Sequence, residues 1–154
     1  MKKVNTRNFK KTLSKFSTGI TVVCVKNNNS IYGKTVNSFN SLSLNPPMVL
    51  FSLGNYSSSI KKFSKTKFLS INILSSKQKK LSENFASSVP NLEDIKFIER
   101  KNKTVIIPNC IANLECELMD KIKKGDHIIF ICKVLEIKYN NKLKPLIYFN
   151  SKYF

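Results

Sequence analysis

The chain opens with an apolar pattern of helical period. Phe9, Leu13 and Phe16 recur at spacings of four and three residues, so they share one face of a helix over residues 5–16. Asn5 or Thr6 can cap the start of this helix with a side-chain oxygen. The pattern therefore predicts a short amphipathic helix ahead of the first strand.

Most other apolar residues fall in short runs rich in β-branched and aromatic types, separated by turn residues. These runs lie at residues 20–26, 31–36, 48–54, 68–74, 105–139 and 145–154, the fifth being divided into three by turns. Helical patterns interrupt them at 57–63 and 75–86, and residues 87–104 have the character of an irregular, charged excursion. Many short strands with few helices indicate an antiparallel β-barrel rather than βαβ units.

The totals agree with an ordinary globular domain. A chain of 154 residues, 42% of them hydrophobic, is long enough for one core, and we expect a single domain over 1–154. No apolar run is long enough to span a bilayer, and the basic N-terminus lacks the apolar segment of a signal peptide. These features predict a cytoplasmic protein without a membrane partner.

The cysteines carry no metal-binding pattern. Cys24, Cys110, Cys116 and Cys132 lie among apolar neighbours without C-x-x-C spacing, and the only histidine is His127. We expect free, buried thiols in a reducing compartment and no metal site.

A net charge of +18 brings polyanions into consideration, including nucleic acid, an anionic membrane surface and phosphate-bearing ligands. The lysines are spread along the whole chain, however, and the aromatic residues do not form a nucleic-acid-binding pattern. This distribution argues against specific nucleic-acid binding. It favours a solvated surface that also attracts anionic cofactors.

One segment does not fit a purely structural strand. Residues 33–47, GKTVNSFNSLSLNPP, mix small hydroxyls and an amide with apolar residues, and neither face of an extended chain would be cleanly apolar. Small hydrogen-bonding side chains suit a polar, planar or phosphate-bearing ligand. The same composition also suits a turn rich in Ser and Asn, and both interpretations remain open at this point.

Two further features have a functional and a plain interpretation. Ser57–Ser59, followed by Lys61 and Lys62, can hold an anion or can simply begin a helix. His127 follows the turn residues Gly125 and Asp126, and taken alone it is a residue exposed after a turn.

Six segments occur in the order and spacing of a known family: FSTGITVVCV, GKTVNSFNSLSLNPPMVLFSL, FLSINIL, ANLECEL, GDHIIFICKV and PLIYF. From about Phe9 to Tyr153 the chain resembles the flavin reductase-like, FMN-binding split-barrel family, the reductase components of two-component flavin-dependent monooxygenases. The most specific parts are T-x-N-S-F-x-S-x-S-x-x-P-P and G-D-H. The resemblance implies a mainly β fold, a six-stranded antiparallel split β-barrel with a few short helices.

The resemblance also implies a flavin site for FMN, or possibly FAD, with NAD(P)H as co-substrate. The segment that matches Thr35 to Ser43 lines the flavin in the family, and the parts matching Ser52 and the Ser57–Ser59 turn approach its phosphate end. His127 is the candidate for orienting the nicotinamide nucleotide. The implied cofactor-binding residues are Thr35, Val36, Asn37, Ser38, Ser41, Ser43, Ser52, Ser58 and Ser59.

The implied activity is that of an NAD(P)H:flavin oxidoreductase, a homodimer that supplies reduced flavin to a partner monooxygenase. The alternatives are an FMN-binding electron-transfer or carrier protein without efficient NAD(P)H oxidation, and a basic nucleic-acid-binding barrel. Three departures from the family pattern bear on nicotinamide use: Lys34, Cys132 in place of a glycine, and Asn150-Ser151 in place of a glycine-containing turn.

Overall fold

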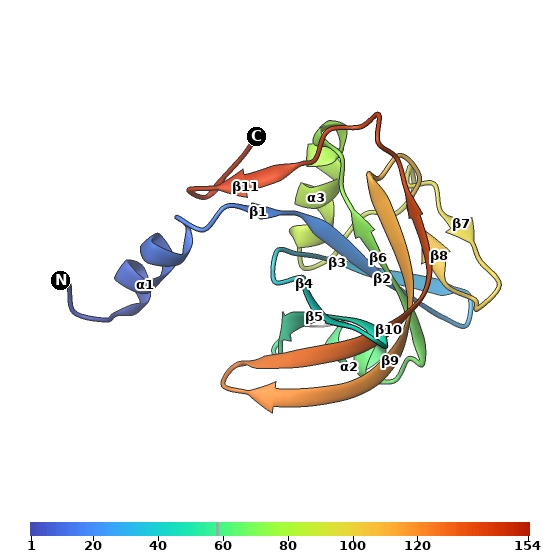
Figure 1. Cartoon of the computed structure of the whole chain (residues 1–154), viewed down its shortest axis with the longest axis horizontal. Coiled ribbons are helices and arrows are strands. Elements are labelled where there is room, and N and C mark those ends of the chain that lie inside the picture. The colour runs from blue at the N-terminus through green and yellow to red at the C-terminus, as the bar shows by residue number, and fades with distance from the viewer. Residues whose placement is uncertain (58) are drawn as a thin grey trace.

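The computed structural model describes residues 1–57 and 59–154. Within these residues the largest sheet has seven antiparallel strands in the order β3-β2-β6-β9-β10-β5-β4 (Figure 1). Its strands are β2 (Thr21–Asn27), β3 (Ser30–Val36), β4 (Asn40–Leu44), β5 (Pro47–Gly54), β6 (Phe68–Ile73), β9 (Ala112–Lys124) and β10 (His127–Tyr139).

Smaller elements surround this sheet. The other strands are β1 (Thr18–Gly19), β7 (Ile98–Glu99), β8 (Val105–Ile106), β11 (Ile147–Phe149) and β12 (Lys152–Tyr153). The helices are α1 (Thr6–Leu13), α2 (Ile60–Ser64), the 3-10 helix η1 (Ser76–Gln78) and α3 (Lys79–Ala86). Of the helices that the described residues form, none has the length and apolar character needed to cross a membrane.

The sheet curls so that its two ends meet. Strand β3 forms one edge, and the residues that follow it reach β5 near the other edge. There the hydroxyl of Ser38 donates to the carbonyl of Ser52 and accepts from its N–H, both at 3.0 Å. The predicted mainly β, antiparallel class is confirmed. The predicted number of six strands is not, because β4 extends the described sheet to seven strands.

Strand β2 is buried on both faces and separates two cores. Val23 and Val25 point into the barrel, where the rings of Phe51 and Phe130 stack with centroids 5.0 Å apart. The alternate residues, such as Val22, belong to a second core that includes residues of α3 and of the segment before β9. Burial on both faces explains why the strand is an unbroken apolar run rather than an alternating one.

Helix α3 packs directly on β3 because one position has no side chain. A Cβ atom on Gly33 would come within 2.4 Å of the Phe85 ring. That approach fixes the helix against the strand that carries the functional segment, and any larger residue at position 33 would push the two apart.

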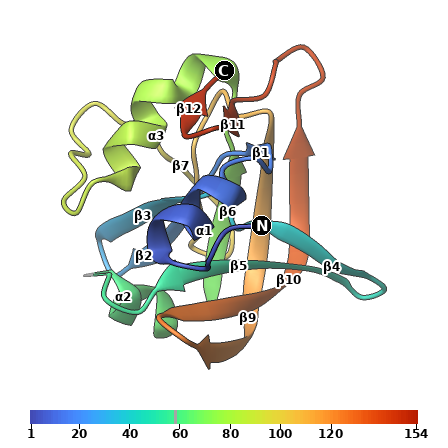
Figure 2. The same cartoon turned by 90° about the vertical axis from the view of Figure 1, so that its left-hand side faces the viewer.

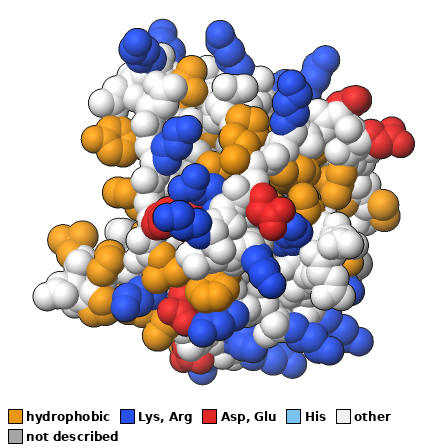
Figure 3. Space-filling view, turned by 90° about the vertical axis from the view of Figure 1, so that its right-hand side faces the viewer, with side chains coloured by type: hydrophobic (Ala, Val, Ile, Leu, Met, Phe, Trp, Pro, Cys, Tyr) orange, Lys and Arg blue, Asp and Glu red, His pale blue; other side chains and the backbone are white. Residues whose placement is uncertain are grey.

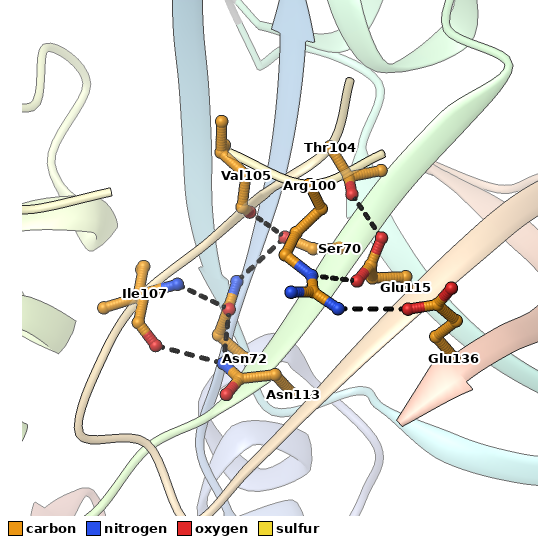
Figure 4. A network of polar contacts seen from close by, with 9 residues as sticks. All are labelled: Ser70, Asn72, Arg100, Thr104, Val105, Ile107, Asn113, Glu115 and Glu136. Atoms are coloured by element: carbon orange, nitrogen blue, oxygen red, sulfur yellow. Dashed lines mark hydrogen bonds and ion pairs between the residues drawn. The ribbon is translucent and has the colours of Figure 1, made fainter. Parts of the chain in front are cut away.

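A buried polar network fastens the segment before β9 to the sheet (Figure 4). The buried carboxylate of Glu115 accepts hydrogen bonds from Arg100 Nε at 2.6 Å and from Thr104 Oγ1 at 2.8 Å. The amide oxygen of Asn72 accepts from the N–H of Ile107 at 2.9 Å. These contacts hold the end of the predicted irregular excursion, which also contains the short strand β7.

The predicted N-terminal helix over residues 5–16 is shorter in the structure, where it ends at Leu13. Of the two predicted caps, Asn5 is the one that caps the start, because its side chain accepts a hydrogen bond from a backbone N–H of the first turn at 2.9 Å. Helix α1 stands away from the barrel in Figure 1 and lies in front of it in the turned view of Figure 2, and Phe9 and Phe16 are 56% and 76% exposed. The apolar face of the helix is therefore uncovered in a single chain.

The C-terminal strands β11 and β12 form a tight hairpin. Asn150 and Ser151, which replace a glycine-containing turn of the family pattern, have φ angles of 50° and 62°, in the left-handed region that favours glycine. The N–H of Asn150 also donates to the carbonyl of Ser14 at 2.7 Å, which ties the end of α1 to this hairpin.

All four cysteines are free and buried, as predicted. Burial raises the pKa of Cys24 and Cys116, raises that of Cys110 to about 11, and raises that of Cys132 to about 12. These thiols stay protonated at neutral pH and are poor nucleophiles. Cys132 belongs to the barrel core, so its departure from the family pattern is a packing change.

Candidate functional site

A cavity of about 520 Å³ lies where β3, β5 and β10 come together. Its wall is formed by residues 34–38, 52–54, 56 and 57, by His127, and by Ala86 at the end of α3 with Ser88 just after it. Antiparallel pairing of His127 with Gly54 brings the start of β10 to the end of β5. The fold thus gathers four distant parts of the chain around one space.

Most of the residues implied by the sequence border this cavity. Those that line it are Thr35, Val36, Asn37, Ser38, Ser52 and His127. Ser41 and Ser43 do not, because they lie on β4, which leaves the cavity to pair with β5. Ser59 borders a neighbouring cavity instead, and Ser58 lies outside the described residues.

The hydroxyls of the central segment are largely used by the protein itself. Thr35 Oγ1 donates to the carbonyl of Ser82 in α3 at 2.6 Å, and Ser38 bonds to the backbone of Ser52. These contacts build the wall. They leave the exposed amide of Asn37 as the polar side chain of this segment that a ligand can reach.

One hydroxyl on the wall is buried without a partner. Ser57 lines the cavity, and among the described residues no group forms a hydrogen bond with its Oγ. Burial of an unsatisfied hydroxyl is unfavourable, so a ligand oxygen that reached this position would recover a hydrogen bond. Ser57 is therefore a residue of the wall whose hydroxyl has hydrogen-bonding capacity left unused among the described residues.

Lys34 lies on the cavity wall and does not point freely into solvent. Its ammonium group donates to the carbonyl of Ser87 at 2.6 Å, which joins β3 to the residues after α3. Partial burial lowers the pKa of Lys34. The side chain supplies positive charge beside the cavity, which favours an anionic ligand.

His127 is the first residue of β10 and is partly buried at the cavity. Its Nδ1 lies 2.7 Å from Asp126 Oδ1, and this contact holds the pKa of Asp126 below its usual range. The contact occupies Nδ1 and leaves Nε2 as the ring nitrogen for a ligand. The His127 side chain remains 43% exposed after the turn, in agreement with the plain interpretation, and it also borders the cavity.

A protein-family model matches most of the chain and shows which family the chain belongs to. The model described as "Flavin reductase like domain" matches residues 13–154. The chain belongs to this family. The resemblance stated from the sequence motifs is thereby confirmed.

Other proteins of the flavin reductase-like family cover nearly the same length. The chain is 34% identical over 137 residues to the FMN reductase (NADH) SmoA of Agrobacterium fabrum, covering 89% of this chain and 79% of the relative. It is 26% identical over 151 residues to the flavin-dependent monooxygenase reductase subunit HsaB of Rhodococcus jostii, covering 97% and 77%. The solved structure of the flavin reductase PheA2 in its native state superposes with a TM-score of 0.92 at 36% identity, covering 98% and 97%.

Tyr56 and Ser88 are among the residues of this flavin reductase-like cavity that escaped sequence reasoning. Tyr56 lies against Gly54, where a Cβ atom would come within 2.8 Å of its ring. An exposed aromatic two residues after a strand-ending glycine is a signal that could have drawn attention to it. Ser88 belongs to the segment after α3 and reaches the cavity only through tertiary packing, so the sequence held no signal for it.

Proposed function

We propose that this protein is an NAD(P)H-dependent flavin reductase that binds its flavin in the cavity between β3, β5 and β10. The observation that carries the proposal is the convergence of Asn37, His127 and the unpaired hydroxyl of Ser57 on one cavity in a flavin reductase-like chain. The relative SmoA is named as an FMN reductase that uses NADH. This function agrees with the activity implied by the sequence motifs.

The groups on the wall fit the parts of a flavin. A flavin has a planar ring with a polar edge and a chain that ends in phosphate. We assign Asn37 to the polar edge, and Ser57 and Lys34 to the phosphate end, where a hydroxyl donor and a cation stabilise negative charge. Thr35, Val36, Ser38 and Ser52 form the supporting wall. Ser41 and Ser43 have no place in this assignment.

The chemistry needs no nucleophile from the protein. A flavin held by these residues would supply the acceptor for the hydride of a reduced nicotinamide, and solvent would supply the accompanying proton. The task of the chain is to hold the two rings in contact and to keep competing water away. We assign His127 to orienting the nicotinamide nucleotide through Nε2, which the Asp126 contact leaves available.

We also propose that the reduced flavin passes to a partner monooxygenase. The relative HsaB is named as the reductase subunit of a flavin-dependent monooxygenase, and such a subunit must release or hand over its product. The four free thiols agree with a reducing, cytoplasmic location. We assign residues 1–154 as one reductase domain.

The working form is proposed to be a homodimer. The apolar face of α1 is uncovered, and Leu44 on the projecting strand β4 is 92% exposed. Apolar side chains gathered on projecting elements are typical of surfaces that a second copy covers.

The two alternatives stated from the sequence are not favoured. A carrier without NAD(P)H oxidation has no support in the relatives, since SmoA is named for its reductase activity. A nucleic-acid-binding barrel would need a concentrated basic surface. Figure 3 shows Lys and Arg side chains spread over one face, with acidic and apolar side chains between them.

The test is anaerobic mixing of the protein and FMN with NADH while the visible absorption of the flavin is followed. Bleaching at a rate that increases with both protein and NADH concentration supports the reductase assignment. Flavin that binds but stays oxidised with NADH and with NADPH would contradict it, and absence of flavin binding would remove the site itself.

A further inference from the structure

Another cavity, of about 520 Å³, lies apart from the one assigned to flavin. Its wall is formed by the turn between β2 and β3, the connection between α2 and β6, and the turn between β7 and β8. The two turns lie on the same side of the molecule, on the right in Figure 1. None of the described residues that line this cavity also lines the flavin cavity.

Lysines dominate the wall, so we call this space the basic cavity. Within the described part of the chain no acidic residue lines it, and its five lysines are Lys26, Lys65, Lys67, Lys101 and Lys103. Two of them have carboxylate partners, because Lys26 contacts Glu99 at 2.6 Å and Lys67 contacts Glu117 at 3.5 Å. Among the described residues no ion pair involves the other three, which are Lys65, Lys101 and Lys103. The cavity therefore keeps an excess of positive charge.

The backbone that carries these charges is held in place. In the turn between β7 and β8, the N–H of Arg100 donates to the carbonyl of Thr104 at 2.9 Å, and the N–H of Lys103 donates to the carbonyl of Arg100 at 3.0 Å. In the connection before β6, Thr66 Oγ1 donates to the carbonyl of Phe68 at 2.7 Å. Because the wall is fixed in this way, a bound anion would relieve the repulsion among the ammonium groups.

The donors on the wall suit phosphate oxygens. Besides the ammonium groups, Asn28 and Asn102 carry amides that form no side-chain hydrogen bond with any described residue. Ammonium and amide N–H groups both donate to phosphate. Several linked phosphates can meet donors from all three parts of the wall, whereas a single phosphate or sulfate can meet only some of them. A wall made of three short connections also suits a compact anion rather than the long backbone of a nucleic acid.

We propose that the basic cavity binds a compact oligophosphate, either inorganic tripolyphosphate or the triphosphate group of a nucleotide. Lys65, Lys101 and Lys103 supply the charge that no carboxylate of the described chain neutralises, and the amides of Asn28 and Asn102 add directional hydrogen bonds. The proposal is independent of the proposed function, because the basic cavity shares no described residue with the cavity assigned to flavin.

The test is calorimetric titration of the whole protein with sodium tripolyphosphate at physiological ionic strength. The variant that combines Lys65→Gln, Lys101→Gln and Lys103→Gln changes only exposed residues, so folding should tolerate it. It should raise the dissociation constant for tripolyphosphate at least about tenfold, since each exposed charge contact contributes a fraction of a kcal/mol to about 1 kcal/mol. For the unaltered protein, sulfate should bind at least about tenfold more weakly than tripolyphosphate, because it carries fewer charges.

A matched variant controls for the loss of charge alone. Lys77→Gln, Lys142→Gln and Lys144→Gln together remove the same charge at exposed residues outside the described wall of the basic cavity. This variant should leave the dissociation constant within about twofold of that of the unaltered protein, because charges this far from the ligand are screened by salt. Equal weakening in both variants would overturn the proposal, because general attraction to a basic protein would then explain the binding.

Two further ligands identify what the basic cavity recognises. ATP that binds as tightly as tripolyphosphate assigns the site to the phosphate chain, whereas ATP that binds more tightly assigns it to a nucleotide. Either result supports the proposal when the variant in Lys65, Lys101 and Lys103 weakens both ligands. A peptide of six glutamates that binds as tightly as tripolyphosphate would overturn it in favour of an acidic protein segment.

The outcomes also separate this proposal from the proposed function. The variant in Lys65, Lys101 and Lys103 should keep the flavin affinity and the KM for NADH of the unaltered protein. A change in either would overturn the proposal, because the basic cavity would then belong to the flavin or to the nicotinamide nucleotide. Absence of tripolyphosphate binding while NADH still reduces flavin overturns the proposal alone, and tripolyphosphate binding without flavin reduction overturns the proposed function alone.

Discussion

Asn37 offers the sharpest test at the scale of single residues. Its side chain is exposed at the cavity mouth, just beyond the end of β3, so its removal should not disturb the core. Asn37→Ala should weaken flavin binding by about 1–3 kcal/mol, the value of one or two hydrogen bonds to a ligand in a partly buried site. The measurement is the flavin dissociation constant, with the unfolding midpoint recorded in parallel.

Asn40 provides the matched control for this change. It carries the same exposed amide but lies on β4 and does not line the cavity. Asn40→Ala should leave flavin affinity unchanged. If both variants bind flavin as the unaltered protein does, Asn37 has no part in the site.

His127 should affect the nicotinamide nucleotide more than the flavin. His127→Ala removes the ring at the start of β10 and should raise the KM for NADH several-fold, while bound flavin stays in place. Asp126→Asn removes only the carboxylate that contacts Nδ1, so it should raise KM less. Steady-state kinetics and flavin titration of both variants check this, and loss of flavin with a normal KM would reverse the assignment.

The sequence could reveal a site residue when a local motif places that residue at the cavity, and not when tertiary packing does. Asn37 and Ser38 follow a strand end within one polar motif, so the motif alone located them. Ser41 belongs to the same motif but is carried off along β4, because residues 40–44 pair with β5 instead of forming a loop. Ser88 arrives through tertiary packing, which no local pattern encodes.

At the scale of elements, Glu115 decides how the segment before β9 is held. Its buried carboxylate accepts from Arg100 and Thr104, whereas Glu136, which also bonds to Arg100, is exposed. Glu115→Gln keeps the size of the side chain but places an amide against two donors. We expect it to lower the free energy of unfolding by about 2–3 kcal/mol, because a buried, hydrogen-bonded charge is lost while Arg100 can still turn to solvent.

Glu136→Gln is the control, because it also removes one carboxylate charge that contacts Arg100. An exposed ion pair contributes little, so this variant should lose less than about 1 kcal/mol. Denaturant unfolding of the two variants under one condition gives the comparison. Equal losses would show that burial of Glu115 has no special role in holding the segment.

The strands were more predictable than the short elements. The run at residues 20–26 is β-branched, and its burial on both faces required that composition. The two-residue strand β7 lies in the segment predicted to be irregular, whereas β8 falls in the predicted run that begins at residue 105. The end of α1 was wrongly predicted because Phe16 keeps the helical spacing from Leu13, although Leu13 is the last helical residue and Phe16 lies in the turn that follows.

At the scale of the whole molecule, the exposed apolar elements predict a dimer. Helix α1 projects from the side of the molecule opposite β7 (Figure 1), and Phe9 on its apolar face is 56% exposed. Covering such side chains with a second copy removes apolar surface from water, which favours association. Light scattering during gel filtration should therefore give twice the mass of one chain.

Phe9→Asp should shift the equilibrium between dimer and monomer toward the monomer, because association would then bury a charge on the apolar face of α1. Ile98→Asp adds the same charge on β7, at a residue that is 43% exposed on the opposite side, and it should leave the mass unchanged. The unfolding midpoint, measured at one protein concentration, should fall for Phe9→Asp, since association stabilises the folded chain by mass action. A mass of one chain for the unaltered protein, or a dimer that tolerates Phe9→Asp, would show that this face is not where two copies meet.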